Sequence, residues 1–457
     1  PMSAQFEGHE VRRALGLAAS PRRIHFDSVS TDTRQLRKGA LFVALRGERF
    51  DGHEFLSRAA GKGALGAVVE EGVELPDLDL QWFVVSDTTR ALGDLARYYR
   101  RRCAARVIGV TGSSGKTTVK EMLAGVLGAD RPTHATSGNL NNHIGVPLTI
   151  LGAPPATEFW VLEMGSNAPG EIARLASIAE PDDALVTTVG PAHLEGFGDE
   201  AGVLREKLSL VRAAKPAGSV VVGERPDVLG TAAIEIRPDT VVAGLDSGSA
   251  WHPDRWEIGA ASAWFERAGS RYEIPVGGEH HLRDAILAAA MAAEVGIESA
   301  AIAAGLAAYR PVGMRGAVRQ LGGLTLVADC NTANPDSFAA AIDYCVSAVP
   351  DRRLIAVVGS MLELGSQSAA AHEQIARALI EAGFSRVVAL GSFRPAFDAV
   401  SGTTNGTRVT SVGKPDEAVA ALVTDLTGDE VILVKASRGE RLERVVHGLA
   451  EQLGTGN

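Results

Sequence analysis

The hydrophobic positions of this chain fall into short, nearly continuous apolar runs separated by longer amphipathic or alanine-rich segments. Such runs are typical of strands buried in a sheet, and the longer segments are typical of helices. Their alternation predicts an α/β protein with mostly parallel sheets and helices on the sheet faces. The predicted strands lie at 40–45, 67–69, 82–85, 106–110, 159–163, 184–189, 219–222, 324–328, 354–358, 387–390 and 431–434, and the predicted helices include 54–62, 88–101, 119–127 and 284–295.

This alternation restarts after two breaks, which divides the chain into three predicted domains. The first covers residues 1–103, the second 104–311 and the third 312–457. The second boundary falls at the turn-forming segment Arg310-Pro311-Val312-Gly313. A length of 457 residues fits about three domains of typical size. Two successive α/β domains leave a cleft between them, where bound substrates could react.

Composition narrows the possible partners and the compartment. The net charge of −10 argues against nucleic acid as the main partner. The sequence has no apolar run long enough to span a bilayer and no signal-peptide pattern, so we expect a cytoplasmic protein without a membrane span. Cys103, Cys330 and Cys345 lack metal-ligand spacing and fit reduced, buried structural thiols.

One glycine-rich segment predicts a phosphate-binding loop. Backbone N–H groups at a helix N-terminus attract phosphate oxygens, Lys116 adds a positive charge, and a threonine hydroxyl can join the ligands of Mg²⁺. The strict pattern begins with a glycine, whereas Val110 stands at that position here. We still expect a bound nucleoside triphosphate, because a strand precedes the segment and a helix follows its Lys-Thr-Thr end. The segment consists of Thr111, Gly112, Ser113, Ser114, Gly115, Lys116, Thr117 and Thr118.

Three further residues could act beside this loop, and each has a plain structural alternative. Glu163 ends an apolar strand, and the carboxyl ends of strands face the ligand crevice in an open α/β sheet, so its carboxylate could hold Mg²⁺. The alternative is a helix-capping or solvated glutamate. His193 also follows a strand, but a lone histidine is as often structural. Lys207 lies on a predicted helix, where a solvated lysine is the ordinary interpretation.

A cluster of amides follows in the loop from Gly138 to Pro147, which contains Asn139, Asn141 and Asn142. Clustered amide groups between glycines suggest a surface that binds a polar ligand. A plain turn is the alternative, because asparagine and glycine are also the common residues of turns. The residues of the loop by themselves leave both interpretations open.

Taken together, these motifs resemble the Mur ligase family, the ATP-dependent amide-forming enzymes of cell-wall precursor synthesis. The resemblance covers nearly the whole chain. It implies the three-domain Mur ligase architecture, with a central P-loop parallel-sheet domain and a C-terminal Rossmann-like α/β domain. Besides the phosphate loop, it rests on Ser30-Thr31-Asp32-Thr33-Arg34 and the segment 45–53 in the first domain, the asparagine loop, Glu163-Met164-Gly165 and the segment 192–198 in the second, and Ala333-Asn334-Pro335-Asp336-Ser337, Leu362-Glu363-Leu364-Gly365 and Val434-Lys435-Ala436-Ser437-Arg438 in the third.

The resemblance also implies roles for particular residues. Lys116, Lys207 and His193 would be catalytic, and Thr117, Glu163, His193 and Lys207 would hold magnesium at two sites. Lys207 would carry a carbamate, which turns an ammonium into an anion able to bind a hard cation. Besides the phosphate loop, His280, Arg315 and Asp329 would contact ATP. The substrates would contact Ser30, Thr31, Arg34, Arg46, Gly47, Asp51, Gly52 and His53, then Asn139, Asn141 and Asn142, and finally Asn334, Lys435 and Ser437.

Within the family, the motifs are most similar to those of the member that joins D-alanyl-D-alanine to UDP-N-acetylmuramoyl-tripeptide. The resemblance implies that a substrate carboxylate attacks the γ-phosphate of ATP, giving an acyl phosphate and ADP. The amine of the dipeptide then attacks the acyl group and phosphate leaves. Such steps depend on positioning and on neutralising developing charge, and closure of the third domain would exclude water. The family also implies a monomer.

Several positions depart from the family pattern, and most of them are expected near the adenine, the ribose or the domain hinge. Loss of a tyrosine removes a stacking surface, and loss of amides removes paired donors and acceptors. We therefore expect weak ATP binding or a reduced preference for ATP over GTP. The family's Asn-Ala-Asp is replaced by Gly223-Glu224-Arg225, His-Asn-x-x-Asn by His280-His281-Leu282-Arg283-Asp284, Asp-Asp-x-Tyr-Asn by Ala328-Asp329-Cys330-Asn331-Thr332, and Gly-Asp-Met by Gly359-Ser360-Met361.

These departures keep two other functions open. The first is that of a divergent paralogue that joins other amino acids or peptides in a specialised pathway. The second is that of a precursor-binding protein without turnover, against which the intact Lys116, Glu163 and Lys207 argue. The motifs also leave open the third residue of the peptide substrate, because diaminopimelate and lysine forms would use the same residues.

Overall fold

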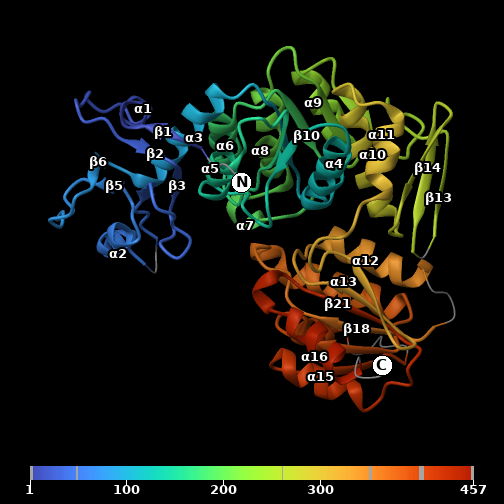
Figure 1. Cartoon of the computed structure of the whole chain (residues 1–457). Helices are drawn as coiled ribbons and strands as arrows, with labels where there is room; N and C mark the ends of the chain where they lie inside the picture. Colours follow the sequence, from blue (N-terminus) through green and yellow to red (C-terminus); the bar gives the residue numbers. More distant parts are fainter. Residues whose placement is uncertain (1–3, 48–49, 260, 349–351, 401–405, 454–457) are drawn as a thin grey trace.

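The computed structural model describes residues 4–47, 50–259, 261–348, 352–400 and 406–453, with separate sheets in three successive stretches (Figure 1). We call these the N-terminal region (4–102), the central region (106–307) and the C-terminal region (317–453). Glu48 and Arg49, within the segment 45–53 that carries part of the family resemblance, lie outside the described residues. Among the helices that the structure describes, none has the length and apolar character needed to cross a membrane.

The N-terminal region is built on a four-stranded parallel sheet of order β3-β4-β5-β6, beside the short antiparallel pair β1–β2. Alternate residues of β4 enter two different cores, because side chains alternate across a strand. Its elements are β1 (Phe6–Glu7), α1 (Gly8–Ala14), β2 (His25–Phe26), β3 (Ser28–Ser30), β4 (Ala40–Val43), η1 (Gly52–Phe55), α2 (Leu56–Gly61), β5 (Gly66–Glu70), β6 (Gln81–Val85) and α3 (Thr88–Arg102).

The central region contains a six-stranded, fully parallel sheet of order β12-β11-β10-β7-β9-β8. The chain adds β8 and β9 on one side of β7 and β10 to β12 on the other, so β7 is the topological switch point, where ligands bind in open α/β sheets. Its first elements are β7 (Arg106–Thr111), α4 (Lys116–Asp130), β8 (Thr133–Ala135), α5 (Gly145–Gly152), β9 (Phe159–Glu163), α6 (Glu171–Ala179), β10 (Asp183–Val186), α7 (Leu194–Phe197), α8 (Glu200–Ala213), β11 (Val220–Gly223), α9 (Asp227–Ile236) and β12 (Val241–Ala243).

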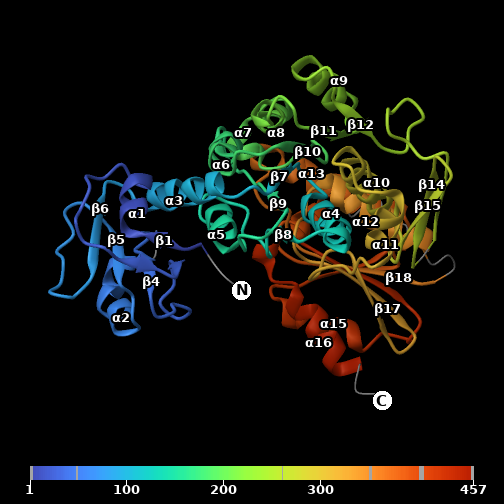
Figure 2. The ribbon, with the colours of Figure 1, turned by 45° about the horizontal axis from the view of Figure 1, so that its top comes forward.

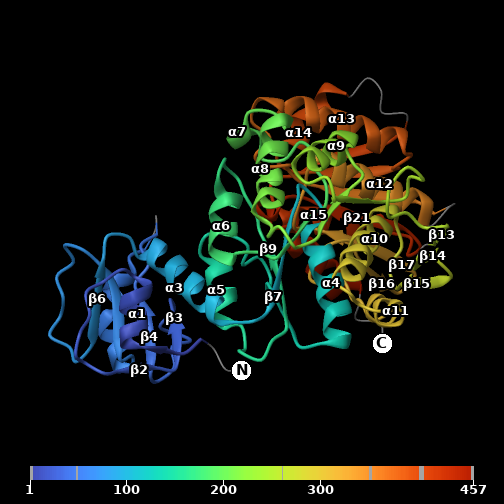
Figure 3. The same ribbon diagram turned by 90° about the horizontal axis from the view of Figure 1, so that it is seen from above.

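The rest of the central region contains a small antiparallel sheet, which the apolar runs do not predict. Its strands are β13 (Arg255–Ile258), β14 (Ala263–Arg267) and β15 (Ser270–Ile274), and α10 (Glu279–Glu294) and α11 (Ser299–Ala307) follow. Each of these short strands contains two charged residues, so none of them is a continuous apolar run. Helices α4, α10 and α11 cover one face of the large sheet, and α5, α6 and α8 cover the other (Figure 3).

The C-terminal region has a six-stranded sheet of order β16-β17-β21-β18-β19-β20, parallel except for β16. Its two faces bury separate apolar cores. Its elements are β16 (Ala317–Leu321), β17 (Leu324–Asp329), α12 (Pro335–Ala348), β18 (Leu354–Val358), η2 (Gly365–Gln367), α13 (Ser368–Glu381), β19 (Arg386–Ala389), α14 (Phe393–Ala399), β20 (Arg408–Ser411), α15 (Pro415–Val423), β21 (Val431–Lys435), η4 (Arg438–Glu440) and α16 (Glu443–Leu453).

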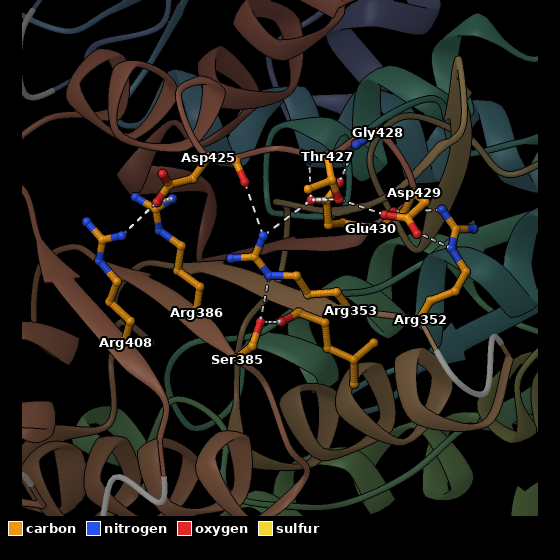
Figure 4. A network of polar contacts seen from close by, with 11 residues as sticks. Arg352, Arg353, Ser385, Arg386, Arg408, Asp425, Thr427, Gly428, Asp429 and Glu430 are labelled. Carbon is orange, nitrogen blue, oxygen red and sulfur yellow. Dashed lines mark hydrogen bonds and ion pairs between the residues drawn. The ribbon is translucent and has the colours of Figure 1, made fainter.

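An arginine network ties together the amino ends of the parallel strands in this region (Figure 4). Asp425 accepts hydrogen bonds from Arg386 at the start of β19 (2.6 Å) and from Arg408 at the start of β20 (2.7 Å). Arg353, just before β18, pairs with Glu430, just before β21 (3.4 Å). This network leaves the opposite edge of the sheet, where the strands end, free to face a ligand.

Helix α3 joins the N-terminal sheet to the central region, where it lies beside α5 (Figure 2). Near its end, the buried Arg100 donates to the Asp182 carboxylate (2.8 Å) and to the Ala179 carbonyl (3.0 Å). The Arg100 guanidinium also lies 5.6 Å from the centre of the Trp160 ring. Arg100 therefore links α3 to the segment that leads into β10.

We predict that Arg100→Ala lowers the free energy of unfolding by about 1.5–3 kcal/mol, because it removes a charge-assisted hydrogen bond to Asp182, which keeps its pair with Lys215 (2.6 Å). Urea unfolding followed by circular dichroism measures the change. The control is Arg90→Ala on the same helix, where Arg90 forms an exposed pair with Asp94 at 3.9 Å; its effect should stay within about 0.5 kcal/mol. Equal effects of the two substitutions would show that the Arg100 contacts add nothing.

Candidate active site

A cavity of about 2770 Å³ lies between the central and C-terminal regions. The segments after β7, β9 and β10 line it from the central side, as expected for the carboxyl ends of parallel strands. The cavity therefore collects residues that are far apart in the sequence. The predicted site residues that line it are Ser113, Ser114, Gly115, Lys116, Thr117, Thr118, Asn141, Asn142, Glu163, His193, His280, Arg315, Asp329, Asn334 and Ser437.

The remaining predicted residues, all among the described positions, do not line this cavity. Thr111 and Gly112 lie at the buried start of the phosphate loop, whereas Asn139 is exposed. Lys207 and Lys435 are almost completely buried. The N-terminal candidates Ser30, Thr31, Arg34, Arg46, Gly47, Asp51, Gly52 and His53 form a separate group, at or after the ends of β3 and β4.

The phosphate loop connects the end of β7 to the N-terminus of α4. Gly115 has φ +78°, a left-handed conformation that glycine adopts without strain. A Cβ atom at Gly112 would lie 1.9 Å from Thr187 Oγ1, so only a glycine lets the loop approach the end of β10 this closely. The first turn of α4, which begins at Lys116, presents N–H groups that have no acceptor within the helix. This is a backbone cradle suited to phosphate oxygens.

Lys116 points back over this loop. Its Nζ donates to the carbonyls of Gly112 (2.8 Å) and Ser113 (3.2 Å). Burial lowers the pKa of Lys116, and the nearby Glu163 carboxylate opposes that shift. A bound phosphate would supply a much stronger anionic partner than two carbonyl groups. The ammonium is therefore available for the β- and γ-phosphates of a nucleotide.

Glu163 lies at the end of β9, is only 1% exposed, and faces the phosphate loop. One carboxylate oxygen accepts from the Thr117 hydroxyl (2.8 Å) and the other from the Asn141 amide (2.7 Å). Glu163 therefore neither caps a helix nor lies exposed to solvent. A buried carboxylate beside a threonine hydroxyl at a phosphate cradle is a suitable donor set for a hard cation such as Mg²⁺. Among the described residues, no group of three or more His, Cys, Asp or Glu side chains is arranged to hold a metal ion.

The other asparagine candidates differ from Asn141 in their contacts. The Asn142 side chain accepts from the backbone N–H groups of Ile144 (3.1 Å) and Gly145 (2.9 Å) at the start of α5. It therefore stabilises the helix entry as well as lining the cavity. The backbone carbonyl of Asn141 accepts from Gly165 N–H (2.8 Å), which fastens the loop to the segment after β9.

His193 precedes α7 and meets a residue of the C-terminal region. Its Nδ1 atom contacts the carboxylate of Glu363. The hydrogen bond from His193 lowers the pKa of Glu363, while burial acts in the opposite direction. Glu363 belongs to a motif that carries the family resemblance, but the sequence could not assign it a role because its partner lies in another region.

Lys207, expected to be solvated by default, is 2% exposed on α8. Its Nζ donates to the Ser166 hydroxyl (2.8 Å), and Ser166 lines the cavity. Burial and the neighbouring Lys116 charge lower the pKa of Lys207 to about 7. A substantial fraction of the amine is therefore neutral near physiological pH, which is the form that reacts as a nucleophile.

From the C-terminal side, Arg315 and Asp329 reach the same cavity. Burial lowers the pKa of Arg315, whereas the carboxylates of Glu163 and Asp329 oppose this effect. Asp329 also pairs with Lys435, whose Nζ donates to the Thr332 carbonyl (3.0 Å). Lys435 thus contacts two residues of the cavity wall, Asp329 and Thr332, and does not itself line the cavity.

Two other C-terminal candidates contact the lining loops. The Asn334 amide donates to the Ser114 hydroxyl of the phosphate loop (3.0 Å), while its carbonyl oxygen accepts from Ser337 N–H (2.8 Å). The Ser437 hydroxyl accepts from Leu362 N–H (3.0 Å). Asn334 therefore joins the C-terminal region directly to the phosphate loop.

Glu224, which belongs to one of the segments that depart from the family pattern, has several partners in the structure. It forms an ion pair with Arg283 of α10, and its carboxylate also accepts from Leu245 N–H (2.9 Å) and from the Ser249 hydroxyl (2.9 Å). Burial lowers the pKa of Arg283. Glu224 therefore connects α10 to the segment after β12.

Helix α10 also carries His280, His281 and Asp284 around Arg283. The rings of His280 and His281 lie 4.0 Å apart, and His281 Nδ1 donates to the Gly277 carbonyl (2.8 Å). Burial lowers the pKa of both imidazoles, so they are neutral and offer aromatic surface. Burial raises the pKa of Asp284 well above its usual value, while a hydrogen bond with Thr118 opposes the shift. A protonated Asp284 has the shape and hydrogen-bonding pattern of the family's asparagine.

The N-terminal candidates bind one another through polar contacts. Asp51 accepts from Arg46 Nε (2.9 Å) and from His53 Nδ1 (2.5 Å), and His53 Nε2 accepts from Glu70 N–H (3.0 Å). Burial raises the pKa of Asp51, but hydrogen bonds from the backbone and side chain of His53 and from Arg46 outweigh it and lower this pKa to about 2. Arg34 pairs with Asp32 at 2.7 Å. Arg46 also pairs with Glu70 at the end of β5 (3.0 Å), so it joins the segment after β4 to β5.

The fold and the site define a nucleotide-binding α/β protein whose reaction chamber lies between two α/β regions. The chain belongs to the Mur ligase family of ATP-dependent ligases. Family models match in order along it: the Mur ligase catalytic domain over residues 24–100, the middle domain over 110–292 and the glutamate ligase domain over 314–438.

Individual relatives are similar to this chain over almost its full length. The UDP-N-acetylmuramoyl-tripeptide–D-alanyl-D-alanine ligase of Escherichia coli is 37% identical over 94% of each chain, and that of Bacillus subtilis is 34% identical over 93% of each. A crystal structure of MurF from Acinetobacter baumannii superposes with a TM-score of 0.88 at 29% identity, covering 99% of this chain and 100% of that one. MurF from Thermotoga maritima in complex with ADP gives 0.81 at 29% identity, covering 94% and 98%.

We predict that Asp284→Asn makes the protein relatively more stable as the pH rises. The raised pKa of Asp284 means that the folded state keeps a proton that the unfolded state loses above its ordinary pKa, so stability falls with rising pH in that window. Asparagine is neutral throughout and removes this loss. Thermal unfolding of both proteins at pH 5 and pH 8 should show a larger difference at pH 8. An equal difference in unfolding temperature between the two proteins at both pH values would mean that Asp284 is ionised in the folded state.

Proposed function

We propose that this chain joins D-alanyl-D-alanine to UDP-N-acetylmuramoyl-tripeptide in an ATP-dependent reaction of peptidoglycan precursor synthesis. The observation that carries the proposal is the single cavity where the phosphate loop, Glu163 and the C-terminal Arg315 meet. It is supported by full-length relatives that carry this activity in their names. The compartment proposed for the reaction is the cytoplasm, with the protein acting as a monomer.

Each domain has a proposed task. Residues 1–103 bind the UDP precursor through the polar group around Arg46, Asp51 and His53. Residues 104–311 bind ATP at the phosphate loop. Residues 312–457 bind the incoming dipeptide and cover ATP, with Asn334 reaching the loop from that side. This division places the acceptor carboxylate, the γ-phosphate and the dipeptide amine around one chamber.

The residues around the chamber suit an acyl phosphate reaction. The precursor carboxylate attacks the γ-phosphate of ATP and ADP leaves; the dipeptide amine then attacks the acyl carbon and phosphate leaves. Lys116 and the first turn of α4 hold the phosphates and neutralise developing charge. Arg315 adds a second positive charge from the opposite wall. Enclosure between two regions limits access of water to the acyl phosphate.

Magnesium is the proposed metal, at two sites. Thr117, Glu163 and His193 would hold it, and Lys207 would join them as a carbamate. The metal would supply charge neutralisation at the phosphates. The carbamate requires a neutral amine, and the lowered pKa of Lys207 supports this form. The carbamate would form from the amine and carbon dioxide with release of one proton.

We predict that the purified protein, given ATP, Mg²⁺, UDP-tripeptide and D-alanyl-D-alanine, releases phosphate and forms the amide product in equal amounts. Lys116→Ala should lower kcat by about 10²–10³-fold or more, because a preorganised charge is lost. The control is Lys62→Ala, which changes an exposed lysine of the N-terminal region. A panel with diaminopimelate or lysine tripeptides and other dipeptides identifies the substrate. Ligation of another amino acid or peptide, with none of D-alanyl-D-alanine, would favour the divergent paralogue, and precursor binding without turnover would favour the binding protein.

We also predict that enzyme freed of carbon dioxide regains activity when bicarbonate is added, and more completely at pH 8 than at pH 6. The neutral fraction of Lys207 rises as the pH passes about 7, so carbamate formation rises with it. Labelled ¹³C-bicarbonate should give a carbamate signal by NMR that Lys207→Ala lacks and Lys62→Ala keeps. Full activity of Lys207→Ala, with and without bicarbonate, would disprove the carbamate.

A further inference from the structure

The segment that carries His193 is held between the central and C-terminal regions. A Cβ atom at Gly190 would lie 2.2 Å from the Asp336 carboxylate of α12. A Cβ atom at Gly365 of η2 would lie 3.4 Å from the backbone of Glu195. The C-terminal region therefore packs against both sides of His193 along this segment.

Between these two contacts, the buried Nδ1 atom of His193 lies against the Glu363 carboxylate and has no other hydrogen-bond partner among the described residues. A neutral imidazole that donates from Nδ1 to a carboxylate carries its lone pair on Nε2. Carboxylates in this position commonly fix the tautomer and orientation of histidines that bind metals. His193 itself lines the cavity beside the phosphate loop.

The backbone supports a specialised arrangement on both sides of this contact. His193 has φ +53° and Glu363 has φ +66°, and both are non-glycine residues in the left-handed region. Such conformations are unfavourable and persist where surrounding contacts impose them, often at functional sites. The neighbours of Glu363 are indeed fixed: Met361 N–H donates to His372 Nε2 (2.8 Å), and Leu362 N–H donates to the Ser437 hydroxyl (3.0 Å).

We propose that Glu363 is a positioning residue for His193: its carboxylate, supplied by the C-terminal region, holds the imidazole so that Nε2 can bind the metal. The metal site of the central region is then complete only while the C-terminal region lies against the His193 segment. By reciprocity, metal binding favours that contact. This inference rests on the proposed function, in which His193 is a metal ligand.

Mn²⁺ binding tests the proposal without catalysis. The free Mn²⁺ signal in electron paramagnetic resonance is titrated against the full-length protein with a non-hydrolysable ATP analogue and UDP-tripeptide. Glu363→Ala should weaken Mn²⁺ binding by about 10–100-fold. Glu363→Gln keeps an oxygen acceptor for Nδ1–H and should recover part of the affinity. The matched control is Glu373→Ala, which removes a carboxylate of α13 near Arg377 and should leave Mn²⁺ affinity unchanged.

A double substitution separates positioning from direct binding. If Glu363 acts through His193, the His193→Ala, Glu363→Ala double variant binds Mn²⁺ as weakly as His193→Ala alone. Additive losses would overturn the positioning role, and so would an unchanged affinity of Glu363→Ala when His193→Ala binds weakly. Unchanged Mn²⁺ affinity of His193→Ala would instead overturn the metal assignment beneath the inference, whereas the ligation assay tests the proposed reaction separately.

Discussion

Backbone pairing between the phosphate loop and the segment after β10 determines where most groups around the cavity lie. Ser113 N–H donates to the Thr188 carbonyl (2.8 Å), and the Ser113 hydroxyl donates to the Gly190 carbonyl (3.1 Å). The close approach at Gly112 allows this pairing, since any side chain there would collide with Thr187. The phosphate loop and the segment that leads to His193 are therefore held in a fixed position relative to each other.

The basic side chains around the cavity are opposite in sign to the net charge of the chain. The protein carries a net charge of −10, yet Lys116 and Arg315 lie half-buried at the cavity and Lys207 lies buried beside it. Burial lowers the pKa of Lys116 and of Arg315, so these two cations lack full compensation in the structure. A bound polyphosphate supplies that compensation. The charges placed around the cavity therefore determine which ligand binds, and the net charge of the chain does not.

The altered positions on the base side change the chemistry less than their residue types suggest. Glu224 and Arg283 form a pair with each other, and a protonated Asp284 resembles the asparagine that it replaces. Comparison of single positions records only the changed residue types, whereas the structure gives Glu224 an ion-pair partner and favours the protonated form of Asp284 through burial. Asn331, at the position of the family's tyrosine, and the aromatic His280 both line the cavity.

The sequence by itself determined the α/β class and the phosphate loop, because apolar runs and a glycine-lysine pattern are local signals. It did not predict β13–β15, in which two charged residues interrupt each short strand, and its residues alone gave Lys207 the interpretation of a solvated lysine, although the family resemblance assigned Lys207 a carbamate. Only the tertiary structure decided that Lys207 is buried against Ser166, that Glu163 binds Thr117, and that Glu363 meets His193. These outcomes depend on helix packing and on contact between distant regions, and no local pattern encodes either.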